Sequence, residues 1–368
     1  WRRGLPGGEP VTVAGLHSSS IGLGRGARLF AEALRGAGVQ VRAQDVGPTL
    51  QTVPDFALEA PGLLSSPGLL VSHLNPPELA LWLQRTAARG LTGRRHIGYW
   101  AWELPILPPA WTPAFAYVDE VWCPSEFTAD AVRERAPSGT PVRVVPHPIF
   151  QVPRLAPDRA RFGFPADACV VLSALDLKST SARKNPLGAI EAYRRAVPAP
   201  DGRSLLVCKV SGGGDAPERL AEVQAALSDR SDIRLLQQVL SEADMTRLIA
   251  SVDVVLSLHR AEGFGLLLAE ALWLGKPVVA TAWSGVMDFL DEASSALVPW
   301  TPGPVQDVQV MYAGGWWAEP DLDAAAGHLG RLIADPLARE RLGARAAARA
   351  ARVFDAAAWI AAVRPLLD

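Results

Sequence analysis

Short apolar runs alternate with segments of helical periodicity along most of this 368-residue chain. Continuous apolar runs are typical of buried strands, whereas apolar positions spaced by three and four residues are typical of amphipathic helices. In the first half, the predicted strands are 11–16, 39–45, 69–74, 96–101, 120–124 and 142–146, and the predicted helices are 26–37, 77–89 and 125–136, the last N-capped by Ser125. Strands separated by helices indicate an α/β protein with parallel sheets covered by helices.

A proline-rich stretch, 146–165, interrupts this alternation and is predicted to be an interdomain linker. The alternation then restarts with predicted strands at 168–175, 204–210, 233–236, 252–258 and 277–281, and with predicted helices at 186–197, 218–227 and 241–251, the last capped by Ser241. The remaining segments are 299–320, which lacks periodicity, and 322–367, which is helical and rich in Ala and Arg. We therefore expect a first domain at 1–150 and a second at 151–354.

Composition and charge narrow the range of partners. With 20% charged residues and a formal net charge of −2, the chain is typical of a globular protein and gives no indication of a nucleic-acid partner. No apolar run is long enough to span a bilayer. Cys123, Cys169 and Cys208 show neither metal-ligand nor disulfide spacing, which is consistent with a reducing cytosol. We therefore expect a cytoplasmic protein. The twelve tryptophans offer flat faces for sugars, although filling the core is the simpler explanation.

The most informative segment runs from His259 to Glu270, between the predicted strands at 252–258 and 277–281. It contains a glycine-rich turn that opens a helix, and the free backbone N–H groups and positive dipole of such a turn suit a phosphate. Glu262 and Glu270 bracket this turn. Because a carboxylate repels phosphate, each glutamate is expected to meet a neutral group rich in hydroxyls, and sugars are the obvious candidates.

The pair Glu262 and Glu270 resembles the Glu-x7-Glu motif of retaining, nucleotide-sugar-dependent glycosyltransferases of family 4, the group 1 glycosyltransferases. The resemblance implies the GT-B architecture, in which two Rossmann-like parallel-sheet domains face a central cleft. It also implies that a C-terminal helix, here 355–368, packs back on the first domain. It assigns Glu262 to the transferring sugar and Glu270 to the ribose. The other donor-binding residues in this segment would be Gly263, Phe264, Gly265, Leu266 and Leu267.

A cationic run, 178–186, lies directly after a predicted strand and before a predicted helix. Ligands in open α/β sheets bind at the carboxyl ends of strands, so this run is well placed to meet a diphosphate. By resemblance, Lys184 matches the lysine that clamps the diphosphate in the family. Arg183 is the candidate for the second cation, although the family's usual arginine lies further upstream, where this chain has Ala-Leu-Asp. A solvated loop is the alternative interpretation of such a cluster.

Two further donor contacts follow from the resemblance. The turn 17–26 follows a predicted strand, and its Gly22 and Gly24 match a glycine-rich loop that borders the donor phosphates and the acceptor in the family. The nucleobase pocket would include Gln238 and Val239, with backbone contacts dominating. The glycine spacing of the turn does not match the dinucleotide fingerprint, which argues against a dehydrogenase.

The acceptor is expected to bind the first domain, where Trp100, Trp102 and Glu103 form a compact aromatic and acidic group. Indole faces stack on sugars and a carboxylate binds hydroxyls. The alternative is that both tryptophans are core residues and that Glu103 caps a helix. His73 and His96 lie nearby in the sequence but match no motif, and a lone histidine is more often structural.

The activity implied by the resemblance is retaining, hexosyltransferase-type transfer from a UDP- or GDP-linked sugar to a hydroxyl of a glycan or lipid-linked acceptor, in polysaccharide or glycan assembly. The resemblance also implies that no cofactor and no metal are needed, because GT-B enzymes of this family generally work without a metal. Arg85, Arg89, Arg94 and Arg95 with Trp82 are a candidate patch for peripheral contact with the inner membrane face, although a solvated helix face is the favoured interpretation. A sugar-nucleotide epimerase of the same architecture and a catalytically inactive nucleotide-sugar-binding module remain alternatives.

Overall fold

The computed structural model describes residues 10–57, 68–86, 91, 93–177, 181–214, 216–306, 312 and 314–367. The chain divides into two compact units, the first comprising Trp1–Gln151 and Phe354–Asp368 and the second Val152–Val353. The sequence places this boundary between residues 150 and 151. Each unit contains one six-stranded sheet in which all neighbouring strands are parallel. The predicted α/β fold class is therefore confirmed.

The strands of unit 1 are arranged in the order β2-β1-β3-β4-β5-β6. Their bounds are β1 (Val11–Gly15), β2 (Val41–Asp45), β3 (Gly68–His73), β4 (Arg94–Tyr99), β5 (Glu120–Cys123) and β6 (Val142–Val144). The chain passes from β1 outward to β2 and then returns to pair β3 with the other side of β1. This reversal is a topological switch point, the place where open α/β sheets bind ligands.

The helices of unit 1 include a segment from the end of the chain. The bounds are α1 (Gly22–Gly36), α2 (Gly47–Leu50), α3 (Pro76–Arg85), η1 (Pro109–Tyr117), α4 (Glu126–Arg135), η2 (Ile149–Gln151), α12 (Ala356–Val363) and η6 (Arg364–Leu366). Ser125 caps α4 as predicted, because its side chain accepts a hydrogen bond from the amide of Thr128. In α12, Trp359 packs edge-on against Phe30 and donates from Nε1 to the carbonyl of Pro146. The C-terminal helix thus completes the apolar core of unit 1.

The strands of unit 2 are arranged in the order β12-β11-β10-β7-β8-β9. Their bounds are β7 (Cys169–Asp176), β8 (Ser204–Ser211), β9 (Ile233–Gln237), β10 (Val254–Ser257), β11 (Val278–Thr281) and β12 (Ala296–Val298). The chain runs outward from β7 to β9 and then returns to β10 on the other side of β7. This is the strand order of dinucleotide-binding Rossmann domains, and its switch point lies between β7 and β10.

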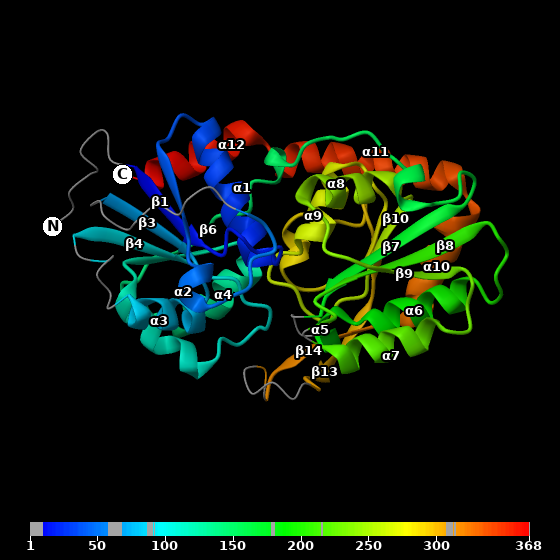
Figure 1. Cartoon of the computed structure of the whole chain (residues 1–368), viewed down its shortest axis with the longest axis horizontal. Helices are drawn as coiled ribbons and strands as arrows, with labels where there is room; N and C mark the ends of the chain where they lie inside the picture. Colours follow the sequence, from blue (N-terminus) through cyan, green and yellow to red (C-terminus); the bar gives the residue numbers. More distant parts are fainter. Residues whose placement is uncertain are drawn as a thin grey trace. The chain divides into compact units, whose positions relative to one another are not determined.

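Helices cover both faces of this second sheet. The bounds are η3 (Ala160–Phe162), α5 (Ser181–Lys184), α6 (Pro186–Ala196), α7 (Pro217–Leu227), α8 (Glu242–Ser251), α9 (Leu266–Trp273), η4 (Ser284–Asp288), α10 (Leu322–Ala334) and α11 (Pro336–Val353). In Figure 1, α6 and α7 lie on one side of the sheet and α8 and α9 on the other. Ser241 caps α8 as predicted, accepting from the amide of Asp244 at 3.1 Å. This cap marks the start of α8, four residues after the end of β9.

The segment 299–320 is not irregular as expected, because it contains an antiparallel hairpin. Its strands are β13 (Trp300–Pro304) and β14 (Trp316–Pro320), with Trp300 opposite Pro320 and Pro304 opposite Trp316. Proline and glycine inside the strands hide the usual alternation of apolar and polar residues. The pairing of the two strands, which is a long-range property, makes them a hairpin.

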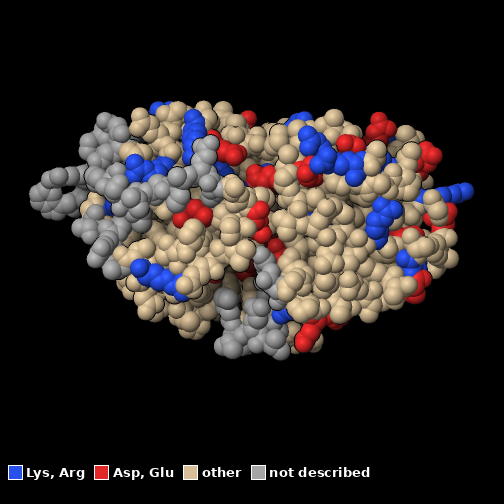
Figure 2. All heavy atoms as spheres, viewed as in Figure 1, with Lys and Arg blue, Asp and Glu red and all other residues tan. Residues whose placement is uncertain are grey.

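Charged side chains of both signs lie on the face of the molecule shown in Figure 2. On the face shown in Figure 2, basic and acidic residues stand singly or side by side among uncharged ones. The arginines of the candidate membrane patch are engaged within unit 1: Arg85 donates to the carbonyl of Thr49, and Arg95 pairs with Glu120 at 3.0 Å. Trp82 is only 1% exposed, so it is no interfacial anchor, and the solvated-face interpretation is favoured. Arg89 lies outside the described residues.

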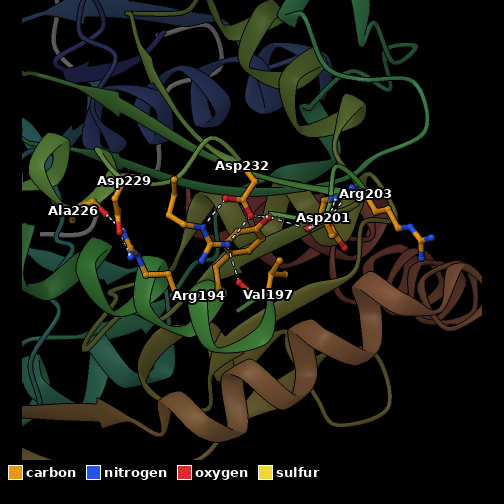
Figure 3. Close-up of polar contacts among 10 residues, drawn as sticks. Arg194, Val197, Asp201, Arg203, Ala226, Asp229 and Asp232 are labelled. Carbon is orange, nitrogen blue, oxygen red and sulfur yellow. Dashed lines mark hydrogen bonds and ion pairs between the residues drawn. The ribbon is translucent and has the colours of Figure 1, made fainter. Parts of the chain in front are cut away.

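A buried polar network joins α6 to the amino ends of β8 and β9 (Figure 3). The hydroxyl of Tyr193 donates to Ser204 at 3.0 Å and lies 3.3 Å from Asp232 Oδ2. Arg230 forms an ion pair with Asp232 at 2.7 Å and donates to the carbonyl of Val197 at 2.7 Å. Because these partners satisfy one another, the network stabilises the sheet at the end opposite the carboxyl edge.

Candidate functional site

The strongest candidate site lies in unit 2 at the carboxyl ends of β7 and β10. These strands pair directly, with Val254 opposite Val171 and Val255 opposite Leu172. Each is followed by one of the loops that the sequence singles out, 177–185 after β7 and 258–265 after β10. Residues 178–180 of the cationic run lie outside the described residues. The switch point therefore brings the predicted cations and the predicted acid to one edge of the sheet.

Arg183, Lys184 and Glu262 form one ion-pair cluster at this edge. Lys184 Nζ contacts Glu262 Oε1, and Arg183 Nη1 lies 3.2 Å from Glu262 Oε2. Arg183 and Glu262 are both buried, at 4% and 7% exposure. Burial by itself raises the pKa of the Glu262 carboxyl, but the charges of Lys184 and then Arg183 outweigh it and lower the pKa to about 2. Glu262 is thus an anion held between two cations.

The two loops are joined by backbone and side-chain hydrogen bonds. Arg183 donates from Nη1 to the carbonyl of Ala261 at 2.8 Å. Asn185 caps α6 by accepting from Gly188 N, and its Nδ2 donates to the carbonyl of Leu258 at 2.9 Å. Asn185 has a φ of 52°, in the left-handed region that asparagine tolerates better than most residues. The sequence analysis did not identify this residue, although an Asn-Pro pair at a helix start signals a cap.

A third loop, after β11, fixes the backbone of the acid. Ser284 Oγ accepts from Glu262 N at 2.9 Å, and Gly285 N donates to the carbonyl of Glu262 at 2.9 Å. His259 is buried against this loop, with Nε2 3.2 Å from the carbonyl of Trp283. Burial lowers the pKa of the His259 ring, which favours its neutral form. No local pattern distinguishes Ser284 in the sequence, and the structure alone identifies its contact with Glu262.

The glycine-rich turn opens α9 as predicted. Gly265 is the N-cap with a φ of 88°, and a Cβ there would lie 2.6 Å from Val286 Cγ1. Its carbonyl accepts from the amides of Leu268 and Ala269 at 3.0 Å. Leu266 and Leu267 precede these residues, so helix geometry leaves their amides without an intrahelical acceptor. Such amides, at the positive end of a helix dipole, are donors for an anion.

The remaining residues of the motif are placed around this helix start. Glu270 lies in the second turn of α9 and is 5% exposed. Phe264 packs against Phe289 with ring centroids 5.2 Å apart, which fixes the turn to the protein interior. Gln238 and Val239 follow β9, the outer strand, and are exposed. The structure therefore places Glu262 beside the cations and Gly263, Phe264 and Gly265 in the turn that follows it. Gln238 and Val239 follow the strand two positions from β7, at the same edge of the sheet.

In unit 1, the glycine-rich turn is a closely packed loop. Gly22 begins α1, so the helix starts earlier than predicted. A Cβ on Gly24, in the first turn of α1, would lie 2.3 Å from the carbonyl oxygen of Leu16, so close packing against the preceding loop already requires a glycine here. Asp55 holds the same loop by accepting from Ser20 N at 2.7 Å. The contact of Gly22 and Gly24 with a donor remains a prediction.

The aromatic group proposed for the acceptor belongs largely to the core. Trp100 is 0% exposed and Trp102 is 1% exposed. Trp102 packs edge-on against Trp111 at 4.8 Å, and Trp100 packs against Phe115 at 4.8 Å. Other rings cover the faces of both indoles. The prediction that these tryptophans stack on a sugar is therefore wrong, and the alternative that they are core residues is favoured. Glu103 is partly exposed, and its role stays a prediction.

The histidines of unit 1 have structural surroundings. His73 is stacked on Tyr99 with centroids 4.1 Å apart. His96 contacts Ser72 Oγ at 2.8 Å and the carbonyl of Tyr117 at 2.5 Å. Burial lowers the pKa of His96 to about 4 and that of His147 to about 3. These rings are neutral at physiological pH and fill the core, in line with the structural interpretation.

Within the described residues, no group of three His, Cys, Asp or Glu side chains is arranged to hold a metal ion. Across the same residues, no helix combines the length and the apolar character needed to cross a membrane.

Comparison with known families gives a partial match. Residues 177–309 match a family model described as "Glycosyl transferases group 1". This range includes the cationic loop, the Glu262–Glu270 segment and the loop after β11.

The chain is also similar to curated enzymes named D-inositol 3-phosphate glycosyltransferase. The chain is 31% identical over 226 residues to a D-inositol 3-phosphate glycosyltransferase of Nocardioides, a match that covers 57% of this chain and 43% of that protein. It is 35% identical over 207 residues to the enzyme of that name from Streptomyces griseus, covering 52% of this chain and 37% of the relative. The chain thus spans less than half the length of these relatives.

Two similar solved structures can be aligned over 97% of the chain. Sucrose-phosphate synthase from Thermosynechococcus elongatus has a TM-score of 0.69 at 17% identity, covering 97% of this chain and 98% of that one. Anabaena HepE in complex with UDP and glucose has a TM-score of 0.65 at 16% identity, covering 97% and 98%. At such identities the likeness concerns the fold, which is that of GT-B glycosyltransferases.

Proposed function

We propose that this protein is a retaining glycosyltransferase that moves a hexose from a nucleoside diphosphate sugar to an acceptor hydroxyl. The observation that carries the proposal is the cluster of Arg183, Lys184 and Glu262 at the switch point of a Rossmann-type sheet. Two cations and the amino end of α9 suit a diphosphate, and the buried acid between them suits a sugar. The match of 177–309 to group 1 glycosyltransferases supports the same conclusion.

The arrangement acts mainly by electrostatic stabilisation. When the bond between the anomeric carbon and the phosphate oxygen breaks, negative charge develops on the diphosphate. Lys184, Arg183 and the amides of Leu266 and Leu267 are donors for that charge, and they are in place before the reaction begins. The acceptor oxygen then bonds to the same face of the anomeric carbon, and its proton passes to the departing phosphate. Glu262 remains ionised and favours positive charge at the anomeric carbon.

The donor and the acceptor are proposed on separate grounds. A UDP- or GDP-linked hexose is proposed because similar structures contain UDP and because Gln238 and Val239 stand where a base contact is expected. The acceptor is proposed to be a glycan or a lipid-linked saccharide in polysaccharide assembly. Glu270 is assigned to the ribose, since a buried carboxylate in α9 suits a hydroxyl pair better than a phosphate. Three buried free cysteines fit the reducing cytoplasm.

The test is thermal unfolding in the presence of UDP, GDP, ADP, dTDP and NAD, each at saturation. A ligand at about one hundred times its dissociation constant adds about 2.7 kcal/mol, which raises the midpoint by several degrees. A shift with one nucleoside diphosphate supports the proposal and selects the donor for an acceptor screen. A shift with NAD alone, or with no ligand, overturns it. Turnover of the donor sugar without any acceptor would instead indicate an epimerase.

A further inference from the structure

Arg260, two residues before Glu262, connects the two loops of the site to the β13–β14 hairpin. Its amide donates to the carbonyl of Arg183 at 2.7 Å, and its Nη1 donates to the carbonyl of Ala182 at 2.7 Å. Its Nε donates to both carboxylate oxygens of Glu319 in β14, each at 2.8 Å. The carbonyl of Arg260 also accepts from Ala318 N at 3.0 Å. One residue thus holds the backbone that carries the cations and the strand that lies beside it.

One face of the hairpin is shaped to hold this arginine. Residues directly opposite each other in an antiparallel pair lie on the same face. Glu319 is opposite Thr301 and Trp317 is opposite Gly303, so these four residues form one face of the hairpin. The guanidinium of Arg260 lies over the Trp317 ring at 5.4 Å, and Trp317 Nε1 donates to Glu319 at 2.9 Å. A Cβ on Gly303 would lie 2.8 Å from the Glu319 side chain, so the glycine leaves room for that carboxylate.

The opposite face of the hairpin is held by the loop that fixes Glu262. Trp300 and Trp316 lie on this face, and the ring of Trp283 packs against both, at 4.4 Å and 5.0 Å. Trp300 Nε1 donates to the carbonyl of Ala282 at 2.8 Å. Trp283 is followed by Ser284, whose hydroxyl accepts from Glu262 N. The hairpin is therefore attached to the loop before Glu262 through one face and to the loop after β11 through the other.

We propose that the β13–β14 hairpin is a positioning device for the diphosphate-binding cations, and that Arg260 and Glu319 are its positioning residues. The inference rests on the proposed function, because it assigns the Arg183–Lys184 pair to a diphosphate. Arg260 would act through other residues, because its side chain contacts Ala182, Glu319 and Trp317. It donates hydrogen bonds to the carbonyls of Ala182 and Arg183. It thereby positions the backbone from which the side chains of Arg183 and Lys184 extend. An arginine is required because its planar group reaches the Ala182 carbonyl, a carboxylate and an indole face together.

The test compares binding of a diphosphate with binding of a monophosphate in matched variants. Arg260→Met and Glu319→Gln remove the ion pair between Arg260 and Glu319. Arg260→Lys keeps the positive charge but removes the planar guanidinium group. Arg195→Met is the control, because Arg195 pairs with two carboxylates, Glu191 and Asp323, on the surface of the same unit. The probes are inorganic pyrophosphate, UMP and UDP, or the corresponding guanosine nucleotides if GDP gives the thermal shift, with affinities from calorimetry and midpoints from thermal unfolding.

We expect Arg260→Met and Glu319→Gln to weaken the binding of pyrophosphate and UDP about 10- to 100-fold, because the cationic groups would be misplaced. The affinity for UMP should change little. Arg260→Lys should be intermediate and Arg195→Met unchanged. A variant that melts earlier but keeps the wild-type ratio of UDP to UMP affinity contradicts the proposal, because that pattern indicates a structural role alone. Wild-type protein that binds pyrophosphate but no nucleoside diphosphate overturns the proposed function instead. Failure to bind either overturns both.

Discussion

A single nitrogen of Arg183, Nη1, lies 3.2 Å from Oε2 of Glu262 and donates at 2.8 Å to the carbonyl of Ala261, the residue before it. The arginine thus contacts both the side chain and the preceding peptide of the acid. A nucleoside diphosphate that reaches this edge meets two cations whose charge is partly offset by the single carboxylate of Glu262. We therefore expect the acid to lower the affinity for anions as well as to direct the sugar.

Glu262→Gln should abolish transfer and tighten the binding of the nucleoside diphosphate. The substitution removes the negative charge that the buried Arg183 contacts at 3.2 Å, so the ligand-free variant should lose about 3 kcal/mol of stability or more. A bound diphosphate would supply the missing charge and restore much of the loss. Turnover, calorimetry and thermal unfolding with and without UDP measure the three effects. Equal losses of transfer and nucleotide affinity would show that Glu262 binds the nucleotide rather than the sugar.

Glu270→Gln should weaken nucleotide binding about 10- to 100-fold, because a hydrogen bond to a charged group contributes about 1.5–3 kcal/mol. Pyrophosphate, which lacks a ribose, should bind as it does to the wild type. Glu222→Gln, an exposed position in α7, is the matched control and should change neither affinity. If nucleotide and pyrophosphate affinities fall together, Glu270 acts on the helix start and not on the ribose.

Gly265→Ala should disrupt the amino end of α9. The residue has a φ of 88° and its new Cβ would lie 2.6 Å from Val286 Cγ1, so strain and a clash act together. We expect a loss of about 1–3 kcal/mol and weaker pyrophosphate binding. Gly327→Ala provides the control within α10, where a Cβ meets no atom within 4 Å, and it should stabilise by about 0.5–1 kcal/mol. A Gly265→Ala protein with wild-type stability and affinity would exclude this role for the turn.

The protein should lose stability as pH falls below about 6.5, before carboxylate protonation becomes important. Burial lowers the pKa of His147 to about 3 and that of His96 to about 4. As pH falls below about 6.5, both rings are therefore protonated in the unfolded chain while they stay neutral in the folded chain. Each ring should contribute a slope of about 1.4 kcal/mol per pH unit between its unfolded and folded pKa values. Unfolding midpoints from pH 7.5 to 4.5 measure it. His147→Gln should flatten the profile, and an unchanged slope would exclude His147 as its source.

Asp232→Asn should destabilise unit 2 without changing nucleotide affinity. The carboxylate of Asp232 is 4% exposed and pairs with Arg230, which is 8% exposed, so its loss leaves a buried cation at a cost of about 3 kcal/mol or more (Figure 3). Asp229, which pairs with Arg194 nearby, is 64% exposed, and Asp229→Asn should cause no measurable loss. Denaturant unfolding of the two variants checks the contrast. Equal stabilities would show that the network contributes little.

The amino-acid sequence determined the elements and the chemistry of the site. Apolar runs and helical periodicity are local properties, so most strands and the longer helices of both units could be predicted from them, whereas β12 and the β13–β14 hairpin could not. Lys184, Glu262 and Gly265 could be identified for a similar reason: a cation, an acid and a glycine directly after apolar runs stand at strand ends in any parallel sheet. The resemblance to family 4 then assigned their roles, which the predictions above test.

Only the tertiary structure decided which strand ends meet. Strand order is a long-range property, and the pairing of β7 with β10 brings Arg183 to Ala261, 78 residues further along the chain. The burial of Trp100 and Trp102 is likewise a tertiary property. The sequence suggested that their indoles stack on a sugar, but rings from η1 cover them. The β13–β14 hairpin was also invisible, because its prolines and glycine break the alternation. Its importance for Arg260 follows from side-chain contacts that form only when distant segments pack together.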